Sequence, residues 1–211
     1  MNKVLLFDFD GTIADSFQNL LEIIKSLSSK YDLPKLTGKQ INALRSRDAK
    51  TIMELLKIPI YKIPLMAHDV RKIQGEHIAK LEAFKDIPKI LHKLKDKKFT
   101  LSILTSNKEA NVKKFLSNNH INIFNNVYGD AGIFQKARAI GKFLKKNHYK
   151  KDEVIYIGDE IRDILACRKI GIKIVSVTWG YNSKESLIKN KPDFVANTPK
   201  ELLKIFGLIS S

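Results

Sequence analysis

Hydrophobic and polar positions divide this chain into two different textures. Residues 4–7 form a continuous apolar run, which predicts a buried strand at the start of the chain. Between about residues 17 and 84 the apolar positions recur at helical spacing, and no strand-like alternation occurs. We expect the first helix to begin near Phe17, with Asp15 or Ser16 as its cap. Three prolines should divide the helical stretch: Pro34, Pro59 and Pro64.

Beyond about residue 84 the pattern alternates between helices and strands. The predicted elements are a helix at 87–94, a strand at 99–104, a helix around 112–116, a short strand near 127–128, a helix at 137–144, a strand at 154–157, a helix at 161–170 that ends at Gly171, strands at 172–177 and 194–196, and a helix at 200–206. Such alternation predicts an α/β fold, a Rossmann-like doubly wound parallel sheet with helices on both faces.

The helical stretch interrupts this α/β pattern directly after its first strand. We therefore predict a core made of residues 1–16 and 85–211, with residues 17–84 as an inserted helical cap domain. Open parallel sheets bind ligands at the carboxyl ends of their strands. Because the insertion begins at the carboxyl end of the first strand, we expect it to overhang that edge of the sheet.

Charge is the most unusual property of the composition. The chain has 38 Lys and Arg residues against 22 Asp and Glu, which gives a net charge of +16. An excess of this size attracts polyanions. The basic residues are interspersed with acidic ones along nearly every segment, however, and no basic stretch alternates with aromatic residues. We expect that nucleic acid is not the partner, and a positive field that attracts small anionic substrates is compatible with the same charge.

The cellular location is expected to be the cytoplasm. The chain enters its first strand without a signal region, and no apolar stretch has the length of a membrane span. The single cysteine, Cys167, excludes an internal disulfide and lies in an apolar setting, which predicts a buried structural thiol.

Two carboxylates stand at the end of the first strand. Asp8 and Asp10 are two residues apart, so their side chains point the same way, and Gly11 then allows a sharp turn close to a ligand. Like charges this close repel unless a cation lies between them or one of them keeps a proton. The pattern suits a nucleophile beside an acid/base group, held together by a divalent metal.

Three later segments bring further polar residues to the strand ends. Residues 105–107, Thr-Ser-Asn, precede a helix, where a hydroxyl and free amides can hold an anion or simply cap the helix. Asp159 and Asp163 are four residues apart at a helix start and share one face. Lys136 opens another helix, against the dipole preference, which suggests an anionic partner. Taken alone, that lysine fits a solvated position better.

These residues follow one another in an order that resembles the motifs of the haloacid-dehalogenase-type hydrolase superfamily. The matching segments are Asp-Phe-Asp-Gly-Thr at 8–12, the apolar run into Thr105, the lysine at 136, and Gly-Asp-x-x-x-Asp at 158–163. That superfamily has a small helical cap where this chain has its helical insertion. Segments 15–16, 103–107 and 177–181 are most similar to the phosphoglycolate-phosphatase-like branch.

The resemblance implies a magnesium-dependent phosphatase that hydrolyses a small phosphorylated metabolite, a phosphoglycolate-like phosphomonoester, through an aspartyl-phosphate intermediate. It implies that Asp8 is the nucleophile and Asp10 the general acid/base. Thr105 would bind a phosphate oxygen, and Lys136 would neutralise charge on the phosphorylated aspartate. The expected phosphate-binding and substrate-binding set is Gly11, Thr105, Ser106, Asn107, Lys136 and Arg45.

Mg²⁺ is the cofactor that the resemblance implies. Its ligands would be Asp8, the backbone carbonyl of Asp10 and Asp159, with Asp163 supporting that set. An acid/base carboxylate at Asp10 favours phosphate over halide chemistry. On the helical insertion, four cationic residues are candidates to meet an anionic substrate: Arg45, Arg47, Arg71 and Lys72.

The substrate is less fixed than the reaction class. Gln135 and residues 85–88 depart from the branch's commoner glycine and proline–glycine turn, although neither change removes a chemical group. The same residues also suit a phosphomutase or a phosphonate hydrolase. A phospho-receiver module combines similar groups on a parallel sheet, but it needs no helical insertion and would be roughly half this length. The oligomeric state stays open.

Overall fold

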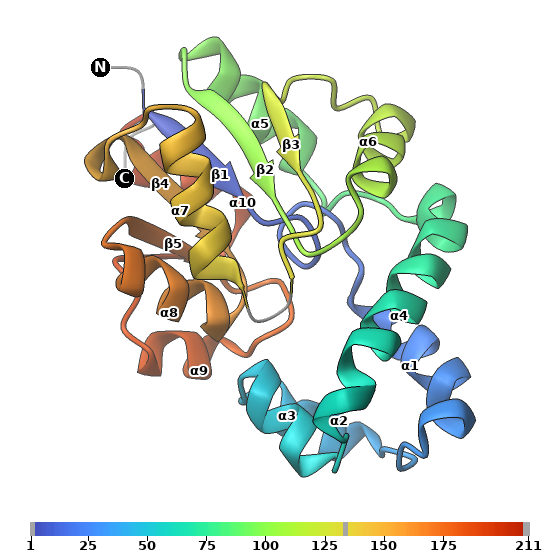
Figure 1. Ribbon diagram of the computed structural model, residues 1–211. Helices are drawn as coiled ribbons and strands as arrows, with labels where there is room; N and C mark the ends of the chain where they lie inside the picture. Colours follow the sequence, from blue (N-terminus) through green and yellow to red (C-terminus); the bar gives the residue numbers. More distant parts are fainter. Residues whose placement is uncertain (1–2, 133–134, 209–211) are drawn as a thin grey trace.

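The computed structural model describes residues 3–132 and 135–208. Among these residues, six strands form one parallel sheet in the order β3-β2-β1-β4-β5-β6 (Figure 1). The strands are β1 Val4–Phe7, β2 Thr100–Leu104, β3 Asn126–Tyr128, β4 Val154–Gly158, β5 Lys173–Val177 and β6 Phe194–Ala196. The strand order reverses between β1 and β4, so the switch point at which such sheets bind ligands lies at the centre of this one.

Helices cover both faces of the sheet. One face, with Leu5 and Phe7, packs against α5 Ile87–Asp96, α6 Glu109–Asn118 and α10 Pro199–Ile205. The other face, with Val4 and Leu6, packs against α7 Lys136–Lys146, α8 Ile161–Ile170 and α9 Lys184–Lys189. All four residues of β1 are buried because alternate side chains enter the two cores. The predicted α/β doubly wound fold is confirmed.

The ends of the predicted elements of the sheet and its helices lie within three residues of the observed ones, and the largest difference is at the start of α6. Helix α8 ends at Gly171, whose φ of +83° gives the left-handed C-cap that the sequence predicted. Helix α9, which was not predicted, has only six residues and is capped by Ser183, whose hydroxyl accepts from the amide of Ser186. A short 3₁₀ turn, η3 Lys151–Glu153, precedes β4.

The helical insertion contains four α-helices and two 3₁₀ turns among the described residues. They are α1 Phe17–Tyr31, α2 Gly38–Leu44, α3 Ala49–Leu55, η1 Ile60–Lys62, α4 Ile63–His77 and η2 Ile78–Lys80. Pro34 and Pro59 lie between helices, and Pro64 lies in the first turn of α4, where it costs no hydrogen bond. These helices enclose a third apolar cluster, which includes Ile23 and Met66 and is separate from the two cores of the sheet.

Ser16 occupies the N-cap position of α1, but its side chain makes no cap hydrogen bond. Its hydroxyl lies 2.8 Å from that of Tyr181 instead. Ser16 thus occupies the predicted cap position, but its side chain contacts the loop that follows β5 and makes no cap hydrogen bond.

The two connections to the helical insertion run side by side. Ala14 and Ala83 form an antiparallel bridge, and the amide of Phe84 donates to the carbonyl of Ile13 at 3.0 Å. The chain thus leaves and rejoins the sheet immediately beyond the acidic end of β1. In Figure 1 the insertion lies on the side toward which the strand arrows point, so it is placed beside the carboxyl ends of the strands.

Candidate active site

The residues predicted from the strand ends converge around Asp8. Asp8 follows β1, and its carboxylate Oδ1 accepts from the amide of Phe9 at 2.8 Å. Its Oδ2 accepts from the Lys136 ammonium at 2.7 Å. Asp8 is 2% and Lys136 3% exposed, so this ion pair is shielded from solvent. One oxygen of Asp8 is thereby oriented by a backbone amide and the other by a positive charge.

Lys136 is buried, and the interpretation of it as a solvated lysine is wrong. Besides Asp8, its Nζ lies 3.0 Å from Oδ1 of Asp163 and 2.7 Å from the hydroxyl of Tyr156. Burial alone would lower the pKa of Lys136, but the carboxylates of Asp163 and Asp8 outweigh it, and the pKa is raised. The lysine therefore stays charged at the acidic end of the sheet.

Tyr156 is a site residue that sequence reasoning missed. The Tyr156 hydroxyl, which accepts from Lys136, also donates to the carbonyl of Leu104 at 3.2 Å. This second hydrogen bond holds the hydroxyl in position to accept from the lysine. Tyrosine is common in strands, and Tyr156 lies in the middle of the apolar run of β4, so the sequence carried no signal for a polar role.

Asp10 is placed differently from Asp8. Its Oδ2 accepts from Nδ2 of Asn107 at 3.0 Å, while its Oδ1 is enclosed and has no hydrogen-bond partner among the described residues. Burial raises the pKa of Asp10 to about 6, against the lowering effect of Asn107 and with a further rise from Asp8. Two carboxylates at one strand end thus have different environments.

Residues 105–107 form a tight turn beside Asp10. The amide of Asn107 donates to Oγ1 of Thr105 at 3.1 Å, and both side chains are buried. Helix α6 begins two residues further on and has Lys108 at its N-cap, without a side-chain cap bond. The alternative interpretation of Ser106 or Asn107 as an ordinary helix cap is therefore wrong. Asn107 is used instead to hold Asp10.

Three buried carboxylates form a cluster suited to a metal ion. Asp8, Asp159 and Asp163 each offer an oxygen, and these oxygens lie within 4.8 Å of one another. Burial and the neighbouring Glu160 and Asp8 raise the pKa of Asp159 well above its usual range. Burial likewise raises the pKa of Asp163 to about 6, although Lys136 opposes the rise. Such a crowded all-oxygen set is the donor chemistry that a hard divalent cation such as Mg²⁺ prefers.

The side chain of Asp159 is held in place from two sides. Oγ1 of Thr12 donates to its Oδ1 at 2.7 Å, and the amide of Tyr181 donates to its Oδ2 at 2.7 Å. Gly11, with φ of +76°, and Gly180 lie so close to Asp159 that a Cβ on either would collide with its carboxylate. These two glycines are required because the backbone closes around a buried acid.

Arg45 connects the helical insertion to the loop after β5. Its Nε donates to the carbonyl of Tyr181 at 2.9 Å and its Nη2 to that of Gly180 at 2.8 Å. In return, Nδ2 of Asn182 donates to the Arg45 carbonyl at 2.7 Å. The guanidinium also lies 4.8 Å from the ring centre of Phe17. Arg45 therefore joins the insertion to the same loop that holds Asp159, and its predicted contact with substrate stays a prediction.

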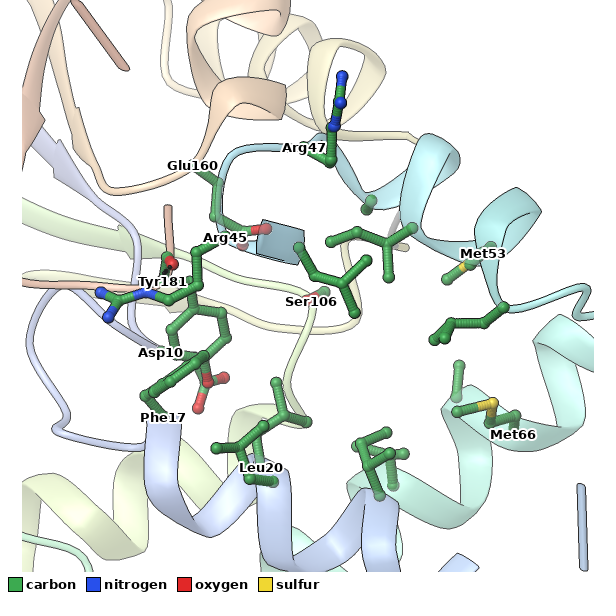
Figure 2. Close-up of a pocket in the computed structure, with 18 of the residues that line it drawn as sticks. Asp10, Phe17, Leu20, Arg45, Arg47, Met53, Met66, Ser106, Glu160 and Tyr181 are labelled. Atoms are coloured by element: carbon green, nitrogen blue, oxygen red, sulfur yellow. Dashed lines mark hydrogen bonds between the residues drawn. The ribbon is translucent and has the colours of Figure 1, made fainter. Parts of the chain in front are cut away.

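A cavity of about 300 Å³ lies between the helical insertion and the strand ends (Figure 2). Asp10, Ser106 and Asn107 line it from the sheet, together with Glu160, Arg162, Tyr181 and Asn182, and the insertion contributes mostly apolar residues. Arg47 and Arg71 are also among the lining residues. Lys72 is exposed and is not among the described residues that line the cavity.

The fold and this site define a hydrolase family, and comparison with known proteins agrees. The family model of haloacid dehalogenase-like hydrolases matches residues 5–177, and the chain belongs to that family. A phosphoglycolate phosphatase of Synechococcus elongatus is 28% identical over 203 residues, with 96% of each chain covered. A phosphoglycolate phosphatase of Vibrio parahaemolyticus is 24% identical over 222 residues, with 98% of this chain and 96% of the relative covered.

Solved structures show the same fold. A haloacid dehalogenase-like hydrolase of Streptococcus pneumoniae superimposes with a TM-score of 0.80 at 23% identity and covers 97% of this chain and 98% of its own. A predicted phosphatase of Clostridium acetobutylicum has a TM-score of 0.82 at 22% identity and covers 99% and 100%. The family match and the phosphoglycolate phosphatase relatives confirm the predicted superfamily, its phosphoglycolate-phosphatase-like branch and the enzyme class, a hydrolase of the phosphatase type.

The remaining predictions concern the membrane, the cysteine, the cellular location, the metal and the roles of individual residues. Within the described part of the chain, no helix is both long and apolar enough to cross a membrane. Cys167 is buried, as predicted. The cytoplasmic location, the identity of the metal and the roles of the individual site residues stay predictions.

Proposed function

We propose that this protein is a magnesium-dependent phosphatase that hydrolyses a small phosphorylated metabolite through an aspartyl-phosphate on Asp8. The observation that carries the proposal is the environment of that carboxylate. Asp8 is fixed by Lys136 at 2.7 Å and belongs to a cluster of three buried acids. Phosphoryl transfer depends mostly on positioning and on charge stabilisation, and this cluster provides both.

Asp8 and Asp10 divide the chemistry between them. Asp8 attacks phosphorus with a carboxylate whose orientation is set by the Phe9 amide at one oxygen and the Lys136 ammonium at the other. Asp10, with a pKa of about 6, carries the proton that the leaving oxygen needs as its bond to phosphorus breaks. Its enclosed Oδ1 has no partner among the described residues, so it is the oxygen that remains for this contact. Asp10 then accepts a proton from the water that hydrolyses the phosphorylated enzyme.

The phosphoryl oxygens are held by groups that surround Asp8. Lys136 supplies a positive charge, and Thr105, Ser106 and Asn107 supply hydroxyl, amide and backbone donors at the end of β2. Gly11 lets the backbone of the turn after β1 approach the same position. Donors fixed before the substrate arrives stabilise developing charge without having to reorient.

Asp8, Asp159 and the backbone carbonyl of Asp10 would hold Mg²⁺, with Asp163 supporting them through its contact with Lys136. When bound, the ion would neutralise the phosphate dianion beside an otherwise repelling carboxylate. Thr12 and the Tyr181 amide keep the Asp159 carboxylate directed into the cluster.

Residues 17–84 are proposed as a cap over the strand ends, with residues 1–16 and 85–211 as the catalytic core. Three observations support this division. The insertion has its own apolar cluster, its two connections lie side by side, and it lines the cavity next to Asp10. A cap in this position can exclude water and select the leaving group.

Turnover of p-nitrophenyl phosphate with and without Mg²⁺ tests the proposed function. The wild type should be active with Mg²⁺ and inactive in excess chelator. Asp8→Asn should be inactive, and Asp15→Asn, a nearby exposed carboxylate outside the cluster, should keep wild-type activity. Activity that survives the chelator or the Asp8 substitution would refute the proposal.

A further inference from the structure

The cavity beside Asp10 has a polar end and an apolar end. The polar end is at the sheet, where Asp10, Ser106 and Asn107 line it. The opposite end is formed by side chains of all four helices of the insertion. Figure 2 shows Asp10 and Tyr181 on one side and Met53 and Met66 across the cavity from them. A ligand that reaches from one end to the other must itself change from polar to apolar.

The apolar end is hollow, although its side chains are of the kind that normally form a core. Ile41 and Leu44 of α2 and Ile52 of α3 line the cavity, yet neither helix has a single buried residue. Protein interiors are close-packed, and voids larger than a water molecule are few. A space of about 300 Å³ lies at the lower end of the roughly 300–1,000 Å³ range of small-molecule pockets. The volume and lining therefore fit an apolar group of several carbons.

The described residues that line the cavity include four arginines, Arg45, Arg47, Arg71 and Arg162, and the last of these forms an ion pair with Glu160. Two nitrogens of Arg45 are occupied by the carbonyls of Gly180 and Tyr181. Figure 2 shows the side chain of Arg47 directed away from the cavity. The backbone carbonyl of Arg71 accepts from Asn111, whose amide also donates to Asn107, and the Nε of Arg71 is buried without a hydrogen-bond partner among the described residues. The apolar side chains that line the cavity, Met53 and Met66 among them, offer a carboxylate no countercharge in place of its lost hydration.

We propose that the substrate is a phosphomonoester of an apolar alcohol, with its phosphate at Asp8 and its alkyl or arylalkyl group in the cavity of the helical insertion. This inference rests on the proposed phosphatase function and defines its substrate class. Hydrolysis breaks the bond between phosphorus and the alkoxide oxygen, and the alcohol leaves with the proton from Asp10. The flexible side chains of Met53 and Met66 adapt to groups of different shape.

A series of phosphomonoesters tests the proposal with the wild-type enzyme and Mg²⁺. The series contains methyl, butyl, hexyl and benzyl phosphate together with phosphoglycolate. The three alkyl alcohols and benzyl alcohol are similar leaving groups, so differences in kcat/KM report binding of the organic group. We expect kcat/KM to rise about threefold to fourfold per methylene until the cavity is filled. Hexyl phosphate should exceed phosphoglycolate by at least tenfold. A larger value for benzyl than for hexyl phosphate would identify the arylalkyl class.

Filling the cavity provides the matched variants. Ala67 of α4 lines the cavity, whereas Ala43 of α2 is exposed and is not among its lining residues. Ala67→Phe should lower kcat/KM for hexyl phosphate at least tenfold and leave methyl phosphate within twofold of wild type. Ala43→Phe should change neither. If Ala67→Phe does not fold, as judged by thermal melting, Ala49→Phe on α3 fills the cavity from the other side and carries the same expectation.

The outcomes separate this inference from the proposed function. Equal kcat/KM along the series, or preference for phosphoglycolate, would overturn the apolar substrate class and leave the phosphatase intact. If no ester is hydrolysed, the proposed function fails. Calorimetry then tests separately whether the cavity binds an apolar group. It uses hexylphosphonate and methylphosphonate, whose P–C bonds cannot be hydrolysed by this reaction. At least tenfold tighter binding of hexylphosphonate, with a negative heat-capacity change, supports an apolar phosphorylated ligand, and equal binding or none overturns it.

Discussion

Replacement of Lys136 by Met tests how the acidic cluster is stabilised. Lys136→Met keeps the length of the side chain and its apolar stem but removes the ammonium. That group contacts Asp8 at 2.7 Å, Asp163 at 3.0 Å and the Tyr156 hydroxyl at 2.7 Å. The variant therefore leaves two buried carboxylates without their shared countercharge and a buried hydroxyl with one partner fewer.

The expected loss follows from the burial of these groups. Lys136, Asp8 and Asp163 are all no more than 3% exposed, so solvent cannot take over the role of the ammonium. Removing one partner of a buried ion pair destabilises a protein by about 3–5 kcal/mol. We expect a loss of this size in the free energy of unfolding when a chelator removes divalent metal. With saturating Mg²⁺ the loss should be smaller, because a bound cation neutralises part of the same charge.

Urea unfolding followed by circular dichroism measures the effect. The matched control is Lys142→Met, which replaces an exposed lysine of the same helix and should change stability by less than about 0.5 kcal/mol. If Lys136→Met were no more destabilising than the control in the presence of chelator, the buried ion pair would not hold the site together.

Four further outcomes are expected. Asp8→Asn should lower kcat at least about a thousandfold while circular dichroism shows an unchanged fold, because an amide cannot attack phosphorus; residual activity within a few-fold of wild type would exclude Asp8 as nucleophile. Asp159→Asn should weaken Mg²⁺ binding in calorimetry more than about tenfold, yet raise the urea midpoint in chelator, because it removes a charge that burial disfavours. A lower midpoint would contradict the crowding argument. Arg45→Ala should lower kcat/KM about tenfold, since it breaks contacts between the insertion and a core loop. The loss should be equal for phosphoglycolate and p-nitrophenyl phosphate. A loss confined to phosphoglycolate would make Arg45 a substrate-binding residue. Asp69, whose pKa is lowered by hydrogen bonds from Lys30 and Tyr31, should stabilise the protein relative to Asp69→Asn above the ordinary carboxyl pKa of about 4, and this difference in urea stability should shrink as pH falls through the lowered pKa. A difference independent of pH would exclude the ion pair.

The succession of strands and helices along the chain and the convergence of the polar strand ends could be predicted, because the first follows from local patterns and the second from the fold class. The apolar run of β1 is buried on both faces, and a parallel sheet places the ends of β1, β2 and β4 at one edge. Asp8, Thr105 and Asp159 therefore had to come together once the strands were identified. The positions of these three residues relative to the sheet needed no long-range information beyond the fold class.

The partners of Lys136, Asn107 and Arg45 could not be predicted, because they depend on contacts between residues far apart in the sequence. Lysine is almost always exposed, so burial of Lys136 became expected only through a resemblance to other enzymes. Asn107 fitted a helix cap, but α6 has its N-cap at Lys108, so Asn107 lies one residue before that position. Arg45 meets a loop some 135 residues further along the chain.

The cavity lined by the helical insertion could not be predicted from the sequence for a different reason. The apolar stripe with Leu20, Leu21 and Ile24 predicts a helix face turned away from solvent. In the structure these three side chains line the cavity. Periodicity does not distinguish a side chain that packs against a neighbour from one that lines a cavity. Only the spacing of the helices shows which of the two occurs.

Trapping the phosphorylated enzyme tests directly whether Asp8 is the nucleophile. The wild type with Mg²⁺ and a phosphomonoester is quenched during turnover and treated with borohydride, which reduces an aspartyl-phosphate to homoserine, and the position is read by peptide mass spectrometry. We predict homoserine at position 8, none at position 10, and none in Asp8→Asn. Turnover that yields homoserine at another aspartate, or at none, would contradict the proposed mechanism.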